Sequence, residues 1–377
     1  MIAFGTYDTA RHPRFAVLVE GLRAHGVKVT ELNRPLGFST ADRVRMLEQP
    51  WRLPALAGRL LRCWAALVGD AVRHRRAEGR PRAVLVGYLG HFDVLLARLL
   101  YPRSVVVLDH LVFAGDTAAD RGAVGLRVRL LAGLDRLAIR CADLVVTDTE
   151  EHLRMLPDPD KGVVVLVGSP EVWRAAAQQV PAEEAEPSKG QDEGAASAEL
   201  SVVFFGLYTP LQGVPVIAEA VRDAVAAGAP LRVTMVGTGQ ELPQAREILA
   251  LTPGVTWHDW VEYAKLPGLV ASHQICLGIF GDTPKAVRVV PNKVYQGLAA
   301  GCVVVTSDTP PQRRAVGENV ELVPAADPCA LADRLAELCA PEALADARGR
   351  AAQGRDRIRP QAVTEPLAAQ LRRRAAW

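Results

Sequence analysis

Short apolar runs alternate with longer segments in which apolar residues recur every three or four positions. The short runs are typical of strands buried on both faces, and the longer segments of amphipathic helices. Such an alternation predicts an α/β protein built on parallel sheets. The expected strands lie at residues 2–4, 28–32, 83–86, 104–108, 144–147 and 163–167 in the first half, and at 201–205, 231–236, 255–257, 276–279 and 302–306 in the second.

The first half also contains three segments with a clear helical pattern, at residues 14–25, 52–76 and 122–141. The segment 52–76 combines large apolar residues with six arginines, which permits two interpretations. One is a helix that docks on anionic lipid. The other, which we favour, is a cleft-lining helix whose last-turn arginines complement the helix dipole.

Residues 174–199 differ from the rest of the chain because they contain almost no large apolar side chain. From 175 to 199 there is one lysine against six acidic residues. A segment of this composition cannot bury enough surface to order itself. We therefore expect an acidic linker or inserted loop that contains a domain boundary.

The amino-acid composition excludes several classes of protein. A hydrophobic fraction of 49% and a charged fraction of 23% over 377 residues are ordinary for a soluble globular protein. An aromatic content of 5% and the lack of a stripe of basic and aromatic residues argue against a nucleic-acid partner. The six cysteines lack metal-ligand or CxxC spacing, so we expect reduced thiols, a cytoplasmic location and no metal site. No apolar run is long enough to span a membrane.

The stretch 279–310 carries the clearest chemical signal. Proline and asparagine at Pro291 and Asn292 favour the start of a helix, and Gly301 favours its end. Lys293 lies in the first turn of this helix. A helix start with free amides and a nearby cation is a favourable site for phosphate.

This stretch resembles the donor-site segment of the retaining GT-B glycosyltransferases of family 4, the glycosyl transferases group 1. Pro-Asn-Lys at 291–293 matches one subgroup, and Gln-Gly-Leu-Ala-Ala-Gly at 296–301 before a valine-rich strand matches the family pattern. Other segments match in the family's order, more weakly in the first half. They are residues 142–149, 203–206, 212–214, 236–241, 255–261 and 321–327.

The resemblance implies the GT-B architecture, with two Rossmann-like doubly wound domains facing each other across a cleft. Residues 1–173 would form the N-terminal acceptor-side domain, and residues 174–199 the acidic linker. Residues 200–355 would bind the nucleotide-sugar. Residues 356–377 would form a tail helix packed back on the N-terminal domain.

The function implied is transfer of a sugar from a nucleotide diphosphate sugar to an acceptor hydroxyl, with retention and without a required cofactor. UDP-sugar is the favoured donor, and the acceptor is a small natural product or a lipid-linked or cell-surface glycan. A lipid-linked acceptor would bring the protein into peripheral contact with the inner membrane surface. Cations near the departing diphosphate would stabilise the charge that develops there.

Candidate residues follow from these motifs and from strand ends, because α/β proteins bind ligands at the carboxyl ends of their strands. The expected catalytic residues are His110, Arg288 and Lys293. The expected donor-binding residues are Gly206, Val261, Lys285, Pro291, Asn292 and Gln296. The expected acceptor-side residues are Gly5, Thr6, Tyr7, Asp8 and His91, and no residue is assigned to a metal.

The chain also departs from the family at charged positions. Tyr208 and Gln212 lie near positions where many members carry Arg and Lys, and the family's Glu pair is replaced by Arg288 and Gln296. We therefore expect Arg288 to replace the missing cations or to face an acidic sugar. Two alternatives stay open, a GT-B-fold nucleotide-sugar 2-epimerase and a binding partner protein without transferase activity. Sparse acidic residues around 282–296 count against the epimerase.

Overall fold

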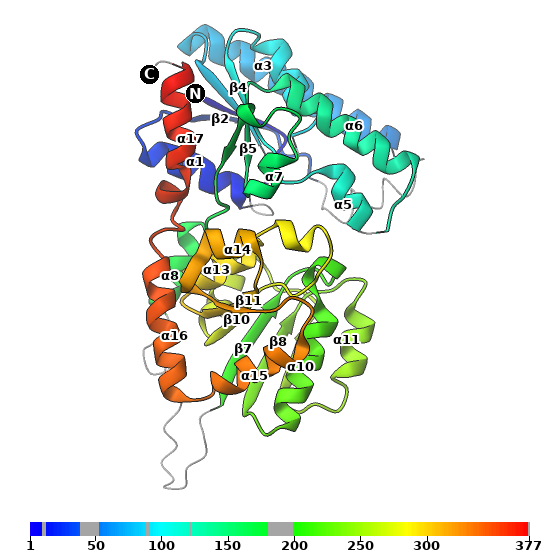
Figure 1. Cartoon of the computed structure of the whole chain (residues 1–377). Coiled ribbons are helices and arrows are strands. Elements are labelled where there is room, and N and C mark those ends of the chain that lie inside the picture. The colour runs from blue at the N-terminus through cyan, green and yellow to red at the C-terminus, as the bar shows by residue number, and fades with distance from the viewer. Residues whose placement is uncertain (10–12, 38–52, 88–89, 121, 180–198, 376–377) are drawn as a thin grey trace. The chain divides into compact units, whose positions relative to one another are not determined.

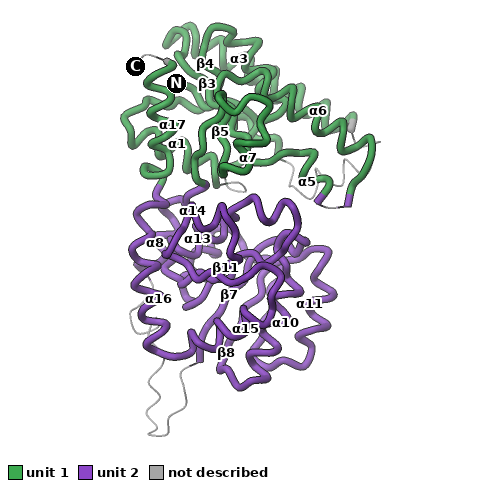
Figure 2. Tube along the Cα trace, in the orientation of Figure 1, with its two compact units in different colours: residues 1–119, 123–166, 360–377 green, residues 120–122, 167–359 purple. Residues whose placement is uncertain are grey.

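The computed structural model describes residues 1–9, 13–37, 53–87, 90–120, 122–179 and 199–375. The chain divides into two compact units, coloured separately in Figure 2. Unit 1 comprises Met1–Ala119, Ala123–Leu166 and Pro360–Trp377, and unit 2 comprises Asp120–Gly122 and Val167–Arg359. The units therefore divide at Leu166 and Val167, whereas the sequence places the boundary in 174–199. Most of that acidic stretch, residues 180–198, lies outside the described residues.

Unit 1 is built on a parallel sheet of six strands in the order β2-β1-β3-β4-β5-β6. All its strand pairs are parallel because each strand is followed by a helical crossover. The strands are β1 (Ile2–Gly5), β2 (Thr30–Asn33), β3 (Ala83–Val86), β4 (Val105–Asp109), β5 (Leu144–Thr147) and β6 (Gly162–Val164).

Helices cover both faces of this sheet, since successive strand residues point to opposite sides. Ile2 and Phe4 lie in the core cluster under α3 (Leu53–Glu78), α4 (Asp93–Leu100) and α6 (Leu126–Cys141). Ala3 lies in the opposite cluster with α1 (Arg14–Ala24) and α17 (Pro360–Ala375). Two short helices, α5 (Ala114–Asp120) and α7 (Glu150–Arg154), follow β4 and β5.

Helices α1 and α17 pack closely although they are far apart in sequence (Figure 1). A Cβ on Gly21 of α1 would lie 2.2 Å from the carbonyl oxygen of Pro360 and from Thr364 Oγ1. The two helix backbones can approach this closely only because Gly21 has no side chain. The last described helix is therefore an integral part of unit 1.

Unit 2 repeats the architecture on a second parallel sheet, in the order β12-β11-β10-β7-β8-β9. Its strands are β7 (Leu200–Phe205), β8 (Leu231–Val236), β9 (Val255–His258), β10 (Ile275–Leu277), β11 (Val303–Ser307) and β12 (Glu321–Val323). The apolar runs predicted the first five of these strands to within two residues at either end. Strand β12 was not predicted, because its three residues form too short a run.

The helices of unit 2 enclose a large apolar core that includes Val202, Phe204 and Val233. Helix α13 begins at Asn292 and ends at Ala299, with Gly301 at a φ of 98° just beyond. The sequence predicted this helix, but Pro291 rather than Asn292 occupies the cap position. The other helices are α8 (Glu171–Gln179), α10 (Val214–Ala226), α11 (Leu242–Ile248), α12 (Leu266–Ala271), α14 (Pro310–Val316), α15 (Pro328–Glu337) and α16 (Pro341–Gly354).

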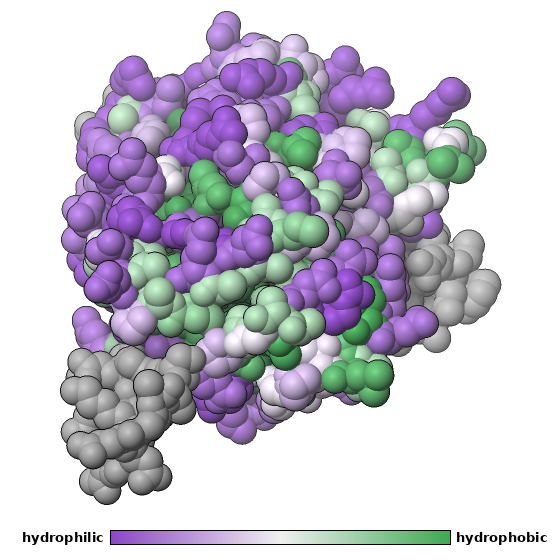
Figure 3. Space-filling view, turned by 60° about the horizontal axis from the view of Figure 1, so that its bottom comes forward, coloured by the Kyte–Doolittle hydropathy of each residue, from purple (hydrophilic) through white to green (hydrophobic). Residues whose placement is uncertain are grey.

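On the face drawn in Figure 3, hydrophobic residues are interspersed with hydrophilic ones. Among the described residues, no helix combines the length and the apolar character needed to cross a membrane. Single apolar residues surrounded by polar ones are common on the surface of folded proteins.

Candidate functional site

The carboxyl edge of the sheet in unit 2 is lined by glycine backbone. Strands β7 and β8 end next to Gly206 and Gly237, whose φ angles of 146° and 130° disfavour any other residue. A Cβ on Gly237 would lie 1.9 Å from the carbonyl oxygen of Gly206, and one on Gly239 would lie 2.4 Å from that of Tyr208. The edge therefore exposes main chain at the place where parallel α/β sheets bind ligands.

Lys293 brings a cation to this glycine edge from the start of α13. Its Nζ donates a hydrogen bond to Gln212 Oε1 at 2.5 Å and lies 3.7 Å from the centroid of the Phe204 ring. A Cβ on Gly206 would lie 3.0 Å from the same Nζ. Only 4% of Lys293 is exposed to solvent.

Burial has a large electrostatic effect on this lysine, since it removes water from the charged form. It lowers the pKa of Lys293 to about 7, and the nearby Cys276 thiol acts in the opposite direction. Near pH 7 the Lys293 amine is therefore protonated in part of the molecules and neutral in the rest. An anionic ligand beside it would favour the protonated form.

Lys293 brings a cation to Gln212, which belongs to the segment 207–212 that lacks the charges found in relatives. The sequence suggested that Arg288 replaces the missing cations or faces an acidic sugar, and this stays a prediction. Arg288 lies in a short turn of helix, Ala286–Arg288, and its Nε donates to the carbonyl oxygen of Pro284 at 2.6 Å.

The other predicted donor-side residues lie on neighbouring segments of unit 2. Pro291 and Asn292 are half-buried at the start of α13, and Gln296 is buried one turn further along. Lys285 is half-buried and caps the short turn that contains Arg288. Val261 is half-buried beyond β9, next to Trp260, an exposed aromatic residue.

In unit 1, the loop that follows β1 is held by a buried carboxylate that the sequence analysis missed. Asp93 Oδ2 accepts hydrogen bonds from the Thr6 amide at 2.7 Å and from Thr6 Oγ1 at 2.8 Å. Its other oxygen accepts from Trp64 Nε1 at 2.8 Å. A Cβ on Gly5 would lie 2.9 Å from Asp93 Oδ2, so glycine is needed for this approach.

The predicted acceptor-side residues after β1 have different environments. Tyr7 is buried, its ring centroid lies 4.1 Å from that of Phe15, and its hydroxyl donates to Glu31 Oε2 at 3.0 Å. Burial raises the pKa of Tyr7 far above its usual value. Asp8 is half-buried. The Tyr7 side chain is thus engaged within unit 1.

His91 and His110 meet at the carboxyl edge of the sheet in unit 1, as expected from their places after β3 and β4. Their ring centroids lie 5.1 Å apart. Both approach Asp135 of α6, with His91 Nε2 at 2.8 Å and His110 Nε2 at 3.8 Å from its Oδ1. Asp135 was not predicted, although an acidic residue on the inward face of an amphipathic helix is itself a signal.

His110 is buried, and its Nε2 has no hydrogen-bond partner among the described residues. Burial and the neighbouring His91 lower the pKa of His110 to about 3, although Asp135 acts in the opposite direction. The imidazole is therefore neutral at physiological pH. A neutral imidazole can donate or accept one hydrogen bond at an uncharged group such as a hydroxyl.

Among the described residues, His91, His110 and Asp135 are the one group of possible ligands placed closely enough to hold a metal ion. Ligand atoms of His91, His110 and Asp135 all lie within 4.8 Å of one another. However, the two Asp135 oxygens already accept hydrogen bonds from the amides of Ala114 and Gly115 at the start of α5. The carboxylate is satisfied without an ion, so we assign no metal to it.

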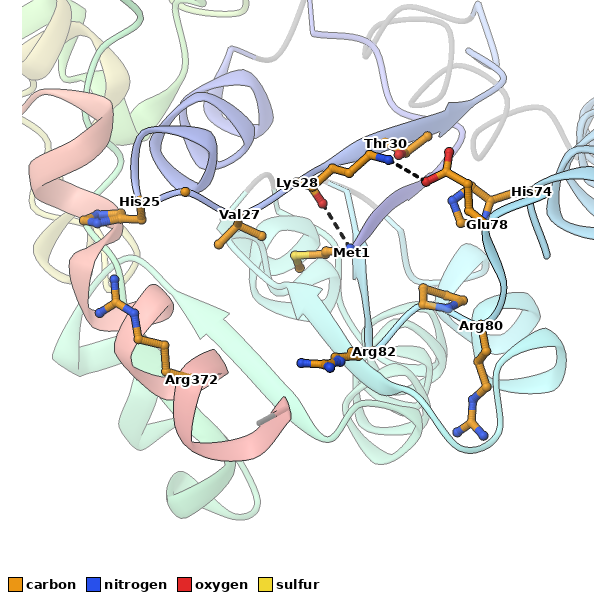
Figure 4. Close-up of a pocket in the computed structure, with 12 residues that line it drawn as sticks. Met1, His25, Val27, Lys28, Thr30, His74, Glu78, Arg80, Arg82 and Arg372 are labelled. Atoms are coloured by element: carbon orange, nitrogen blue, oxygen red, sulfur yellow. Dashed lines mark hydrogen bonds and ion pairs between the residues drawn. The ribbon is translucent and has the colours of Figure 1, made fainter. Parts of the chain in front are cut away.

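The pocket drawn in Figure 4 belongs to unit 1 and lies away from these residues. Its volume is about 400 Å³, and it opens where strands β1, β2 and β3 begin. Lys28 and Glu78 form an ion pair of 2.8 Å beside it. It contains none of the predicted site residues, and it lies at the edge of the sheet opposite to the one where α/β proteins bind ligands.

Comparisons with known proteins agree with this arrangement. Residues 199–340 match the family described as Glycosyl transferases group 1. No curated protein sequence matches the chain. Sucrose-phosphate synthase from Thermosynechococcus elongatus superposes with a TM-score of 0.61 at 14% identity, covering 94% of this chain and 90% of its own. The chain has the GT-B fold.

Two further GT-B structures are similar over most of their length. Anabaena HepE in complex with UDP has a TM-score of 0.59 at 13% identity, and the similarity covers 98% of both chains. The UDP-forming α,α-trehalose-phosphate synthase from Burkholderia vietnamiensis has a TM-score of 0.61 at 13% identity, over 85% of this chain and 78% of its own. The GT-B fold expected from the sequence is confirmed.

Proposed function

We propose that this GT-B protein is a glycosyltransferase that moves a sugar from a nucleotide diphosphate sugar to an acceptor hydroxyl. The observation that carries the proposal is the buried Lys293 ammonium at the glycine edge of unit 2, in contact with Gln212 and adjacent to Gly206. The family match over residues 199–340 and the UDP complex of HepE support a nucleotide-sugar as the ligand. UDP-sugar is the favoured donor, and transfer proceeds with retention.

In this proposal the diphosphate lies against the glycine edge and the start of α13. Main-chain amides near Gly206 and Asn292 donate to its oxygens, and Lys293 supplies positive charge as the sugar–oxygen bond breaks. Fixed donors that act on developing charge contribute a few kcal/mol each, on the order of 100-fold or more in rate. Arg288, Lys285, Pro291, Gln296 and Val261 complete the donor side.

On the acceptor side, the neutral imidazole of His110 offers a hydrogen bond to a sugar or acceptor hydroxyl. His91 orients Asp135, and Asp135 in turn fixes the start of α5. Gly5, Thr6, Tyr7 and Asp8 form the loop beside the acceptor. The acceptor class is a small natural product or a lipid-linked or cell-surface glycan, and the protein acts in the cytoplasm without a metal or cofactor.

The decisive test is calorimetry with UDP, uridine and UDP-sugars on the full chain. Lys293→Met should weaken UDP binding at least tenfold and leave uridine binding unchanged, since only the diphosphate meets the ammonium. Lys265→Met removes an exposed lysine of the same unit and is the matched control. Failure of every nucleoside diphosphate to bind, or equal binding of UDP to the Lys293 variant, would overturn the proposal.

One observation favours a second candidate, a nucleotide-sugar-binding protein without transferase activity. The family's Glu pair reads Arg288 and Gln296 here, so neither position holds a carboxylate for the sugar or the ribose. Release of UDP from a saturating UDP-sugar, followed by chromatography, separates the two candidates. A transferase releases UDP by slow hydrolysis even without its acceptor, and Arg288→Ala should reduce that rate at least tenfold.

A further inference from the structure

Helix α6 presents a stripe of exposed leucines, although its other face is packed in the core. Leu126, Leu130 and Leu137 are 71%, 65% and 46% exposed. They are separated by four and seven positions, so they lie on one side of the helix. Isolated apolar residues are normal on a surface, but an aligned set on one helix face indicates a contact with something apolar.

Other side chains of α6, not these leucines, pack against the core of unit 1. Ala138 and Ile139 pack into the core cluster of unit 1, and Asp135 is buried against His91 and the start of α5. The exposed stripe lies on the opposite side of the helix from Asp135. Folding of unit 1 therefore buries one face of α6 and leaves a second apolar face in water.

Arginines flank the leucine stripe. Arg127, Arg129, Arg136 and Arg140 are all exposed. Asp135 is the one acidic residue of α6, and it points inward. The outer face of α6 thus combines four positive charges, three leucines and no negative charge.

Helix α3, for which the sequence suggested lipid binding as one interpretation, packs part of its apolar face in unit 1. Leu67 lies in the core of unit 1, and Trp64 packs against that core and donates its Nε1 to Asp93. Other apolar residues of α3 stay accessible, since Leu61 and Val72 are 61% and 42% exposed. The interpretation favoured from the sequence, a cleft-lining helix, stays a prediction. Residues 51 and 52 of that segment lie outside the described residues.

We propose that the outer face of α6 docks on an anionic membrane surface. Leucines on one side of a helix insert at the boundary between headgroups and acyl chains, and flanking arginines bind lipid phosphates. A second copy of this chain is a poor occupant, because a symmetric contact would place the arginines of one α6 against those of the other. The surface does not depend on sugar transfer, although it suits an enzyme with a lipid-linked acceptor.

The test is co-sedimentation of the full chain with vesicles of phosphatidylcholine alone or with phosphatidylglycerol added. We expect binding only to the anionic vesicles, and weaker binding at high salt. The double variant Leu126→Gln/Leu130→Gln should weaken the partition coefficient at least tenfold. The double variant Arg127→Gln/Arg129→Gln should weaken it about 25-fold, since each arginine near the surface contributes about fivefold.

The matched control is Leu251→Gln/Arg357→Gln, which removes an exposed leucine and an exposed arginine from unit 2. It should bind vesicles like the unsubstituted chain. UDP binding, measured by calorimetry, should be unchanged in the α6 variants, so this experiment is independent of the proposed transferase. The proposal would be refuted if the chain did not bind anionic vesicles, or if the control variant lost as much vesicle binding as the α6 variants. If the α6 variants lost the ability to form dimers but bound vesicles normally, the outer face of α6 would be a self-association surface.

Discussion

Replacing Lys293 by methionine should change how the stability of unit 2 depends on pH. Methionine keeps the length of the side chain over the Phe204 ring but carries no ionisable group. Lysine at this position is buried with a pKa of about 7, against 10.5 in the unfolded chain. Between these two values the unfolded state holds a proton that the folded state has released.

The sign follows from proton linkage. Where the unfolded state binds more protons, the free energy of unfolding rises with pH, by at most about 1.4 kcal/mol per pH unit for one group. Integrated from pH 7 to pH 8.5 with a folded pKa of 7, the gain is about 1.6 kcal/mol. Below pH 6 both states are protonated, so Lys293 contributes no slope there, and the full cost of its buried charge remains.

Differential scanning calorimetry at several pH values measures this difference directly. The methionine variant should be stabilised relative to the unsubstituted chain, and this advantage should shrink by roughly 3–6 °C in Tm between pH 7 and pH 8.5. Other titrating groups cancel in the comparison. Lys265→Met, at an exposed lysine, should follow the profile of the unsubstituted chain. If Tm depended on pH in the same way for the Lys293 variant and the unsubstituted chain, Lys293 would not be a buried amine that loses its proton near pH 7.

Three further predictions concern the two strand edges. At pH 7.5 the chain should take up part of a proton when UDP binds, because the diphosphate raises the pKa of Lys293. The binding enthalpy measured by calorimetry should therefore differ between phosphate and Tris buffers. Lys293→Met should abolish this difference. Gly237→Ala should lower the Tm of unit 2 and abolish UDP binding, since its Cβ would lie 1.9 Å from the Gly206 carbonyl, whereas Gly268→Ala, with open space around it, should do neither. Asp93→Ala should destabilise unit 1 by several kcal/mol, because it leaves the buried Thr6 and Trp64 donors unpaired; Asp93→Asn keeps one acceptor and should cost less, as measured by urea unfolding.

Much of the fold could be predicted from local pattern. Buried parallel strands are continuous apolar runs, and this is why residues 83–86, 144–147 and 231–236 were placed without error. The end of α13 was also readable, because Gly301 adopts a positive φ that few other residues accept. Strand β12 was missed because three residues carry too little periodic signal.

The candidate site was less predictable, because its chemistry depends on contacts between distant segments. The sequence placed Lys293 in a first helical turn, but its burial comes from Phe204 and Gln212, more than 80 positions upstream. Asp93 and Asp135 were missed for the same reason. Each is a single carboxylate whose partners, Thr6 and Trp64 or His91 and α5, come together only in the folded unit.

The discontinuity of unit 1 has a consequence for biosynthesis. A ribosome delivers residues 1–166 first, then residues 167–359 of unit 2, and only afterwards α17, which packs on α1 beside Gly21. Until α17 emerges, the apolar side of α1 lacks its cover, so a nascent chain holds an incomplete first unit while the second can already close. Chaperone recognition and proteolysis during synthesis should therefore concentrate on α1, although its residues are among the earliest to be made.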